Sequence, residues 1–344
     1  MQAAVLEGVQ KLFIKQKEIP RCKAGEVLLQ VKACSICRTD LKCYELGHRD
    51  LKLPRVLGHE IAGIVVETGS GVDKYKKGDR VQVSPGISCG HCEFCLQGRD
   101  NLCRRLKIMG FNYDGGFAEY LLVPAEAVLS GVLNMIPPHL SYEEASMTEP
   151  LACSLNMQEA LKITSSDTVL IFGAGRLGIL NALLARNSGA KKIFVVEPLE
   201  RRLEQAEKYG FAYLFNPAKS CLYREIMAIT NNRGVDVVIP CCPAAEAFNS
   251  GLHLLAAGGR FGFFSGLLPG DKMKIDLNLV HYKELTMFGA YGCTSAHNKQ
   301  ALSLLASGAL NVKKLLSQVI SLEEVEKGLK MIKTLSQLSV VVSF

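Results

Sequence analysis

The sequence feature that most constrains this fold is the glycine-rich stretch Gly173-Ala174-Gly175-Arg176-Leu177-Gly178. Residues 168–172 before it are mostly apolar, as in a strand buried on both faces, and residues 177–187 carry leucines at helical spacing. An acidic residue, Glu197, ends the next strand-like run, nineteen residues beyond the last glycine. A strand, a G-x-G-x-x-G turn, a helix and a following acid together predict a dinucleotide-binding βαβ unit.

Each glycine of this stretch has a distinct physical role. Gly173 permits the tight turn, Gly175 lets the backbone approach a pyrophosphate, and Gly178 allows the helix to pack closely. The pyrophosphate is then expected at the helix N-terminus, where the backbone N–H groups are free. The alternative interpretation is a glycine turn that binds no ligand.

The charged residues around the turn predict the choice of cofactor. Glu197 would accept hydrogen bonds from a ribose diol and repel a 2′-phosphate, which favours NAD over NADP. Arg202 either reaches the same ribose or belongs to a solvated helix face. Arg176 either adds positive charge near the pyrophosphate or faces water.

Four cysteines lie within fifteen residues: Cys89, Cys92, Cys95 and Cys103. Two nested Cys-x-x-Cys units and a fourth thiol supply the ligands of a closed tetrahedral zinc site, which is typical of structural zinc. An iron–sulfur cluster and a set of incidental or redox cysteines are the alternatives. His91 lies inside this loop, and with four thiols present we expect it to be a bystander.

A second set of potential metal ligands is spread along the chain. Cys37 precedes Gly58-His59-Glu60 by about two dozen residues, and Glu149 follows far downstream. A thiolate, an imidazole and one or two carboxylates suit Zn²⁺ in a site that keeps a position open for substrate. Alone, His59-Glu60 would indicate only a buried histidine beside an acid.

The remaining sequence predicts two domains in 344 residues. Short strands with glycine turns in residues 1–130 indicate a small β-rich domain, and strands alternating with helices from about residue 150 indicate a parallel, doubly wound sheet. The net charge of +7 is spread along the chain, so nucleic acid is not an expected partner. Neither a secretory signal nor an apolar run of membrane-spanning length is found, and thirteen cysteines, several at metal-ligand spacing, favour a cytoplasmic location.

The order of these motifs resembles that of the zinc-dependent medium-chain dehydrogenases. Cys37-Arg38-Thr39-Asp40, Gly58-His59-Glu60, the four-cysteine loop, residues 114–120 and the glycine stretch all occur in the family's order. Glu149-Pro150-Leu151 is similar to the polyol (sorbitol-type) branch. The resemblance implies a GroES-like catalytic domain of residues 1–150 and 290–344, with a structural zinc lobe at 89–103, and a Rossmann NAD-binding domain of residues 151–289.

The resemblance also implies roles for single residues. Cys37 and His59 are expected to bind a catalytic zinc, with Glu60 and Glu149 as carboxylates that bind it directly or through water. Thr39 is expected to take the alcohol proton. Three residues depart from the family pattern, and one further thiol lies near the expected site. Ser35 and Arg38 replace the usual glycines that flank the first zinc cysteine, Arg38 being expected to face the cofactor phosphates. Lys42 replaces a histidine of the proton relay, and Cys153 is a further thiol near the metal.

Together these features predict a zinc-dependent oxidoreductase that transfers a hydride between a secondary alcohol and NAD, with two zinc ions per chain. The expected substrate is a polyol or sugar alcohol, phosphorylated members included. Tyr44, Phe111 and Tyr291 are candidate pocket residues. The alternatives are an aldehyde or ketone reductase of the same family and a non-catalytic NAD-binding relative. Homodimers or homotetramers are expected, without nucleic acid or membrane partners.

Overall fold

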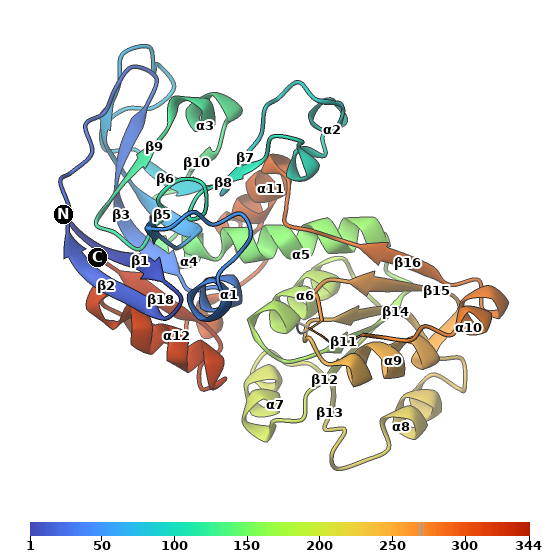
Figure 1. The fold of residues 1–344 in the computed structure, drawn as a ribbon. Coiled ribbons are helices and arrows are strands. Elements are labelled where there is room, and N and C mark those ends of the chain that lie inside the picture. Colours follow the sequence, from blue (N-terminus) through green and yellow to red (C-terminus); the bar gives the residue numbers. More distant parts are fainter. Residues whose placement is uncertain (268–269, 271) are drawn as a thin grey trace. The chain divides into compact units, whose positions relative to one another are not determined.

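The computed structural model describes residues 1–267, 270 and 272–344, which divide into two units. The first unit contains Met1–Ala152 and Cys293–Phe344, and the second contains Cys153–Gly292. Helix α5 (Thr148–Leu161) runs through the first boundary (Figure 1). In the described part of the chain, no helix has both the length and the apolar character needed to cross a bilayer.

The first unit is built mainly of β-sheet. Its largest sheet has the order β10-β6-β5-β3-β18-β17, with β9 also paired to β3, and β2-β1-β4 and β7-β8 form smaller sheets. The strands are β1 (Gln2–Gly8), β2 (Lys11–Gln16), β3 (Val27–Ser35), β4 (Arg55–Val56), β5 (Glu60–Thr68), β6 (Arg80–Val83), β7 (Gly86–Ile87), β8 (Lys107–Ile108), β9 (Tyr120–Val123), β10 (Leu133–Met135), β17 (Gln318–Ile320) and β18 (Val340–Ser343).

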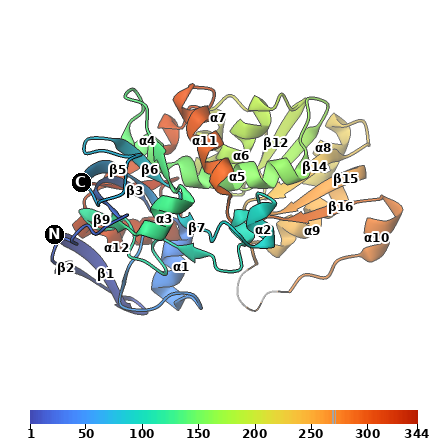
Figure 2. The ribbon, with the colours of Figure 1, turned by 90° about the horizontal axis from the view of Figure 1, so that it is seen from above.

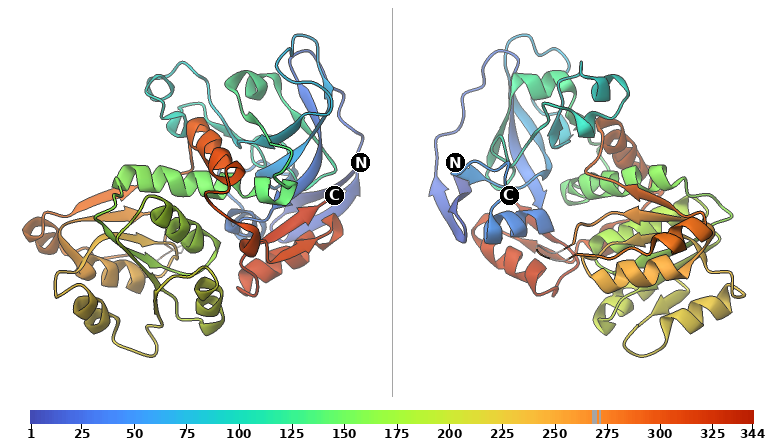
Figure 3. Two further views of the ribbon diagram at one scale, coloured as in Figure 1. Left: turned by 180° about the vertical axis from the view of Figure 1, so that it is seen from behind. Right: turned by 45° about the vertical axis from the view of Figure 1, so that its right-hand side comes forward.

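The C-terminal segment completes this unit. Strand β18 pairs antiparallel with β3, so the two chain ends lie in the same unit (Figure 3). The buried face of the sheets is apolar, with Leu29, Val31, Ile61 and Val342 fully buried. The helices are α1 (Arg38–Leu46), α2 (Glu93–Leu96), α3 (Ala125–Ser130), α4 (Tyr142–Ser146), α11 (Ser295–Ala306) and α12 (Val325–Lys333), with short 3₁₀ turns at Asp100–Leu102, Lys313–Leu315 and Leu322–Glu324.

The second unit is a six-stranded parallel sheet in the order β13-β12-β11-β14-β15-β16. Counted along the chain this is the 3-2-1-4-5-6 order of a Rossmann domain. Its elements are β11 (Thr168–Phe172), α6 (Arg176–Asn187), β12 (Lys192–Val196), α7 (Glu200–Glu207), β13 (Tyr213–Phe215), α8 (Leu222–Ile229), β14 (Val235–Pro240), α9 (Ala245–Leu254), β15 (Leu255–Phe263), α10 (Leu277–Tyr282) and β16 (Thr286–Gly289). The predicted α/β class, with a GroES-like β-rich unit and a Rossmann unit, is therefore confirmed.

Alternating residues of β11 pack on opposite faces of this sheet. A Cβ at Gly178 of α6 would lie 3.7 Å from the side chain of Ile171, whereas one at Gly251 of α9 would lie 3.2 Å from that of Phe172. Helices α6 and α9 therefore cover opposite faces (Figure 2). This explains why the whole of β11 is buried, as its apolar sequence predicts.

Candidate active site

Three of the predicted ligands come together in the first unit. The Cys37 thiol, the His59 imidazole and the Glu60 carboxylate each offer a ligand atom, and these atoms lie within 4.8 Å of one another. Register explains the meeting, because Ser35 at the end of β3 pairs with Glu60 at the start of β5. Cys37 follows two residues later as the N-cap of α1. The side chain of Glu60 is completely buried and that of His59 nearly so.

The backbone before His59 is held by hydrogen bonds from the segment that contains Gly116 and Phe117. Gly58 accepts a hydrogen bond from Gly116 N–H at 2.9 Å, and Leu57 accepts one from Phe117 N–H at 3.0 Å. Gly58 has φ +93°, and a Cβ there would lie 2.8 Å from the Cys34 sulfur. Only glycine fits this position, which holds His59 at the end of the turn.

Asp40 links both ligand segments, a role that the sequence interpretation missed. Its Oδ2 accepts a hydrogen bond from Cys37 N–H at 2.9 Å, and its Oδ1 accepts one from Gly58 N–H at 3.3 Å. The same Oδ1 lies 3.4 Å from His59 Nδ1, and Asp40 is only 1% exposed. A carboxylate behind the metal-binding histidine orients the ring and increases its basicity. The available signal was an acid three residues into a helix that begins after Cys37.

These contacts determine the protonation of His59. Burial lowers the pKa of His59, but the charge of Asp40 and hydrogen bonds with Asp40 and Cys37 outweigh it, so that the pKa is raised well above its ordinary value. A metal ion bound to this imidazole must displace that proton. With Nδ1 facing the Asp40 carboxylate at 3.4 Å, a thiolate, an imidazole nitrogen and a carboxylate form a donor set that fits Zn²⁺ in an open site.

Other predicted site residues lie outside this group. Among the described residues Glu149 is not part of the cluster around Cys37. Its carboxylate, on the first turn of α5, lies within 4.8 Å of the Cys293 sulfur instead. Thr39 is half-buried on α1, and Arg38 and Lys42 are exposed.

A buried serine pair connects the Cys37 and Glu149 segments. Ser146 Oγ donates to the Glu143 carbonyl at 2.7 Å, so it must accept from Ser35 Oγ, which lies 2.6 Å away. Both serines are completely buried. The end of β3 is thereby tied to the end of α4, three residues before Glu149.

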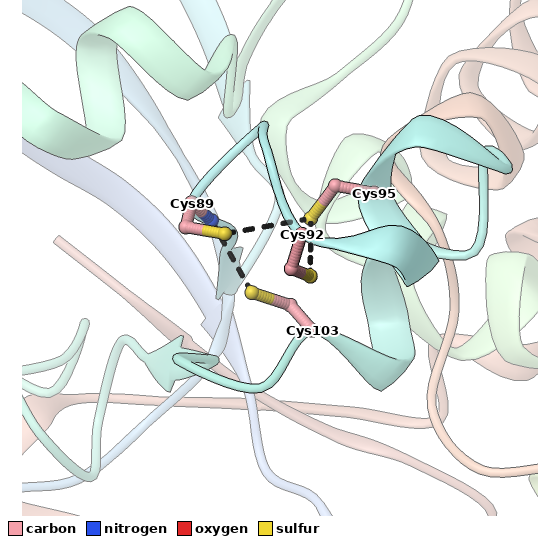
Figure 4. A group of neighbouring side chains, drawn as sticks. All are labelled: Cys89, Cys92, Cys95 and Cys103. Atoms are coloured by element: carbon pink, nitrogen blue, oxygen red, sulfur yellow. Dashed lines mark hydrogen bonds between the residues drawn. The ribbon is translucent and has the colours of Figure 1, made fainter.

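The four-cysteine loop forms a separate cluster, also in the first unit (Figure 4). The sulfurs of Cys89 and Cys95 are 3.9 Å apart, and those of Cys92 and Cys95 are 3.5 Å apart. Zn–S bonds of about 2.3 Å place tetrahedral sulfurs about 3.8 Å apart, so these separations fit zinc. His91 points elsewhere: its ring Nδ1 donates to the Cys89 carbonyl at 2.7 Å, and its side chain is exposed.

Backbone N–H groups of this loop favour the thiolate form of Cys92 and Cys103. The N–H groups of Cys95 and Arg104 lower the pKa of Cys92 to about 6. Burial and the neighbouring thiols raise the pKa of Cys95 to about 12. Backbone N–H groups of Cys89 and Arg105 point at the Cys103 sulfur, each at 3.3 Å. Amide donors of this kind stabilise the charge of a metal-bound thiolate.

The glycine stretch lies in the second unit and has the shape that a pyrophosphate requires. Gly173 has φ +97°, and a Cβ at Gly178 would lie 1.7 Å from the Gly173 carbonyl oxygen. Gly175 is the N-cap of α6 and has no side chain to cover the first helical N–H groups. The loop therefore fits a dinucleotide phosphate at a helix N-terminus. Arg176, at the first position of α6, is 9% exposed.

Glu197 and Arg202 lie together beside this loop. Glu197 Oε2 accepts a hydrogen bond from Ala174 N–H at 2.9 Å, and its Oε1 accepts one from Leu199 N–H at 3.1 Å. Arg202 Nη1 is 3.9 Å from Glu197 Oε2, and a Cβ at Gly175 would lie 3.4 Å from the same nitrogen. Arg202 is thus directed at the loop and is not part of a solvated helix face.

Comparison with known proteins gives the same two parts. The family described as "Alcohol dehydrogenase GroES-like domain" matches residues 23–133, and "Zinc-binding dehydrogenase" matches residues 177–307. L-threonine 3-dehydrogenase of Pyrococcus furiosus is 40% identical over 300 residues, covering 86% of this chain and 84% of that protein. Sorbitol dehydrogenase of Bacillus subtilis is 32% identical over 334 residues, covering 96% and 93%. A solved structure from Sinorhizobium meliloti 1021, described as a zinc-binding dehydrogenase bound to NADP, superposes with a TM-score of 0.93 at 33% identity, covering 100% and 99%.

Proposed function

The chain belongs to the zinc-dependent medium-chain dehydrogenases, in their polyol branch, and from this premise we propose that it oxidises a polyol or sugar alcohol at a secondary carbon with NAD. As a family member it is an oxidoreductase of alcohols that uses zinc and a nicotinamide cofactor. The observation that carries the proposal is the meeting of Cys37, His59 and Glu60, with Asp40 behind the imidazole.

In the proposed mechanism Cys37, His59 and Glu60 would hold the catalytic metal, and Glu149 would be a further carboxylate for it. Zinc in such a site supplies Lewis-acid polarisation of the alcohol oxygen and lowers the pKa of that hydroxyl. Asp40 keeps the imidazole oriented through Nδ1. Thr39 Oγ1 accepts the proton of the substrate hydroxyl. Because Lys42 is exposed, solvent rather than this side chain takes the proton onward.

The second proposed zinc ion is structural. Cys89, Cys92, Cys95 and Cys103 use four thiolates and leave no position for a substrate. Their contribution is local folding free energy. Two zinc ions per chain are the expected content.

For the cofactor we propose NAD. Bound beside the catalytic site, this cofactor would supply the hydride acceptor. The proposed pyrophosphate-binding loop is formed by Gly173, Gly175, Leu177 and Gly178. Arg38 and Arg176 are proposed to supply positive charge to the phosphates. Glu197 retains lone pairs for a ribose diol and repels a 2′-phosphate, while the nearby Arg202 weakens that repulsion. We therefore expect preference for NAD rather than exclusion of NADP.

We further propose that residues 1–150 and 290–344 form the catalytic domain and residues 151–289 the cofactor domain, and that the protein is a cytoplasmic homodimer or homotetramer. Strand β16 is an edge strand of its sheet, and Leu277 and Tyr282 on the neighbouring α10 are 74% and 80% exposed, which supports self-association there. All thirteen cysteines are described and none forms a disulfide, which supports a reducing compartment.

The test is a substrate and cofactor panel with metal analysis. Zinc content should approach two per chain, and NAD⁺ with xylitol or sorbitol should give NADH absorbance at a higher kcat/KM than NADP⁺. Cys37→Ser should keep one zinc and its fold but lose turnover by at least ~10²–10³-fold. Full activity of Cys37→Ser, or preference for NADP⁺, would contradict the respective assignment. L-Threonine belongs in the panel as the second candidate substrate, because the threonine dehydrogenase is 40% identical.

A further inference from the structure

Helix α1 separates the predicted metal ligand Cys37 at its N-terminal end from His48, which follows its C-terminal end. Cys37 is the N-cap of this helix, and Gly47 ends it with φ +72°. Gly47 N–H donates to the Cys43 carbonyl at 3.0 Å, which closes the last turn. The next residue is His48, whose side chain is 24% exposed. An accessible histidine therefore follows the C-terminal end of the helix whose N-cap is a predicted metal ligand.

Two ring contacts join His48 to the metal-binding cluster. The His48 ring packs edge-on against Phe111, with centroids 5.1 Å apart and planes at 83°. The Phe111 ring lies 6.2 Å from the ring of His59, and Phe111 is only 4% exposed. The two imidazoles can be no farther apart than the sum of these centroid distances. This upper limit leaves His48 within reach of the far end of a short polyhydroxy alcohol whose reacting oxygen lies at His59.

The hydrogen bonding of His48 fixes which ring nitrogen carries its proton. Asp50 N–H donates to His48 Nδ1 at 3.2 Å, and the Asp50 carboxylate lies farther from the same nitrogen, at 3.7 Å. Because Nδ1 accepts from this N–H, the neutral ring carries its proton on Nε2. Within residues 1–267, 270 and 272–344, this Nε2–H has no hydrogen-bond partner. An accessible side chain thus presents a single donor beside the apolar ring of Phe111. Apolar walls with a few placed polar groups are the pattern of small-molecule sites.

We propose that His48 is a substrate-recognition residue that donates from Nε2–H to a second hydroxyl of a polyhydroxy alcohol, one to three carbons from the reacting carbon. This inference rests on the proposed function, and it narrows the substrate class. Phe111 forms the wall between the recognition group and the metal ligands. A secondary alcohol with a single hydroxyl cannot use this donor, so selection for polyols comes from His48 rather than from the metal.

The test compares xylitol with butan-2-ol on the zinc-loaded enzyme with two variants. His48→Phe keeps an aromatic contact with Phe111 and removes the donor, whereas His48→Gln restores an N–H donor. Loss of one net hydrogen bond corresponds to about tenfold in affinity. We expect His48→Phe to raise KM for xylitol about tenfold with little change in kcat, and to leave kcat/KM for butan-2-ol within about twofold. His48→Gln should recover most of the xylitol effect. His139→Gln, at a histidine whose ring contacts the Ala306 carbonyl, is the matched control.

Equilibrium binding separates this inference from the proposed function. Xylitol binding to the zinc- and NADH-loaded protein is measured by calorimetry for the unmodified enzyme and His48→Phe. Xylitol binding that weakens about tenfold in the variant supports the inference even if the unmodified protein shows no turnover, in which case the proposed function fails. Equal losses for xylitol and butan-2-ol, or no loss for either, would overturn it and leave His48 a packing residue.

Discussion

Replacing Asp40 by asparagine should weaken the catalytic metal site while leaving the four-cysteine site intact. The carboxylate accepts backbone hydrogen bonds from Cys37 and Gly58 and lies 3.4 Å from His59 Nδ1. Asparagine keeps the shape, but it removes the charge and presents an N–H₂ group to at least one of these N–H donors. Partners behind a metal-binding histidine contribute about 10–100-fold to metal affinity. We expect a loss of zinc affinity in that range.

The same substitution should also cost folding stability. Hydrogen bonds to charged groups contribute about 1.5–3 kcal/mol each, and Asp40 is 1% exposed, so solvent cannot replace them. Since one amide oxygen still accepts a hydrogen bond, we expect a loss of about 2–3 kcal/mol. Asp236→Asn is the matched control, because Asp236 also accepts from a backbone N–H, that of Thr168 at 2.8 Å, but in the other unit. It should lower stability without changing metal affinity.

The assay is chelator competition for zinc, followed across pH, with thermal unfolding of both variants. In the unmodified protein the raised pKa of His59 makes protons compete with zinc, so affinity falls as pH is lowered through that pKa. In Asp40→Asn the histidine pKa falls, and the loss of affinity should begin at lower pH. If Asp40→Asn retains zinc within twofold, or if both zinc ions are lost together, the role assigned to Asp40 is wrong.

Three further predictions address other parts of the molecule. Cys89→Ser should lower the thermal midpoint and the zinc content to about one per chain, with folded molecules still active; outright loss of catalysis at full stability would contradict the structural role. Gly178→Ala should abolish NADH binding, measured by NADH fluorescence, because the new Cβ would lie 1.7 Å from the Gly173 carbonyl oxygen. Burial raises the pKa of Asp236, but hydrogen bonds from Arg233 and Thr168 outweigh burial and lower it. The ionised carboxylate therefore stabilises the fold fully above about pH 4, and this stabilisation is lost as pH falls through the lowered pKa. The stability difference between the unmodified protein and Asp236→Asn, measured by urea unfolding, should shrink below that pH, and a constant difference would refute this.

The fold could be predicted where one physical rule dominates. The strand expected at residues 168–172 is β11. A short, nearly continuous apolar run is typical of a strand that is buried on both faces of a parallel sheet. Ser141 and Glu144 have the spacing of a capping box and form one, with Ser141 Oγ accepting from Glu144 N–H at 3.1 Å. Strand β15 differs: it begins at Leu255, several residues before the aromatic residues Phe261 and Phe263 that are typical of a strand. Alanines and glycines at 256–259 carry no strand signal, and pairing with β14 imposes the extended form.

The candidate site was less predictable because its supporting contacts are long-range. Cys37 and His59 could be proposed from residue type and order alone. Asp40 could not, since its bond to Gly58 depends on how α1 lies against the segment before β5. Glu149 was expected with the catalytic ligands and lies near Cys293 instead. Its role as a ligand of the catalytic metal stays a proposal, because local sequence does not determine which distant residues Glu149 meets.

The distribution of these contacts predicts which parts of the site can change independently. The metal ligands are held by backbone pairing: β3 against β5, and Gly58 against Gly116. Sheet register is hard to alter, because a shift of one residue turns every side chain to the other face. His48 instead follows a glycine turn on an exposed loop and contacts the site only through its ring. Substitutions in residues 47–53 should therefore change substrate choice without changing zinc affinity, whereas substitutions at the strand ends should change both.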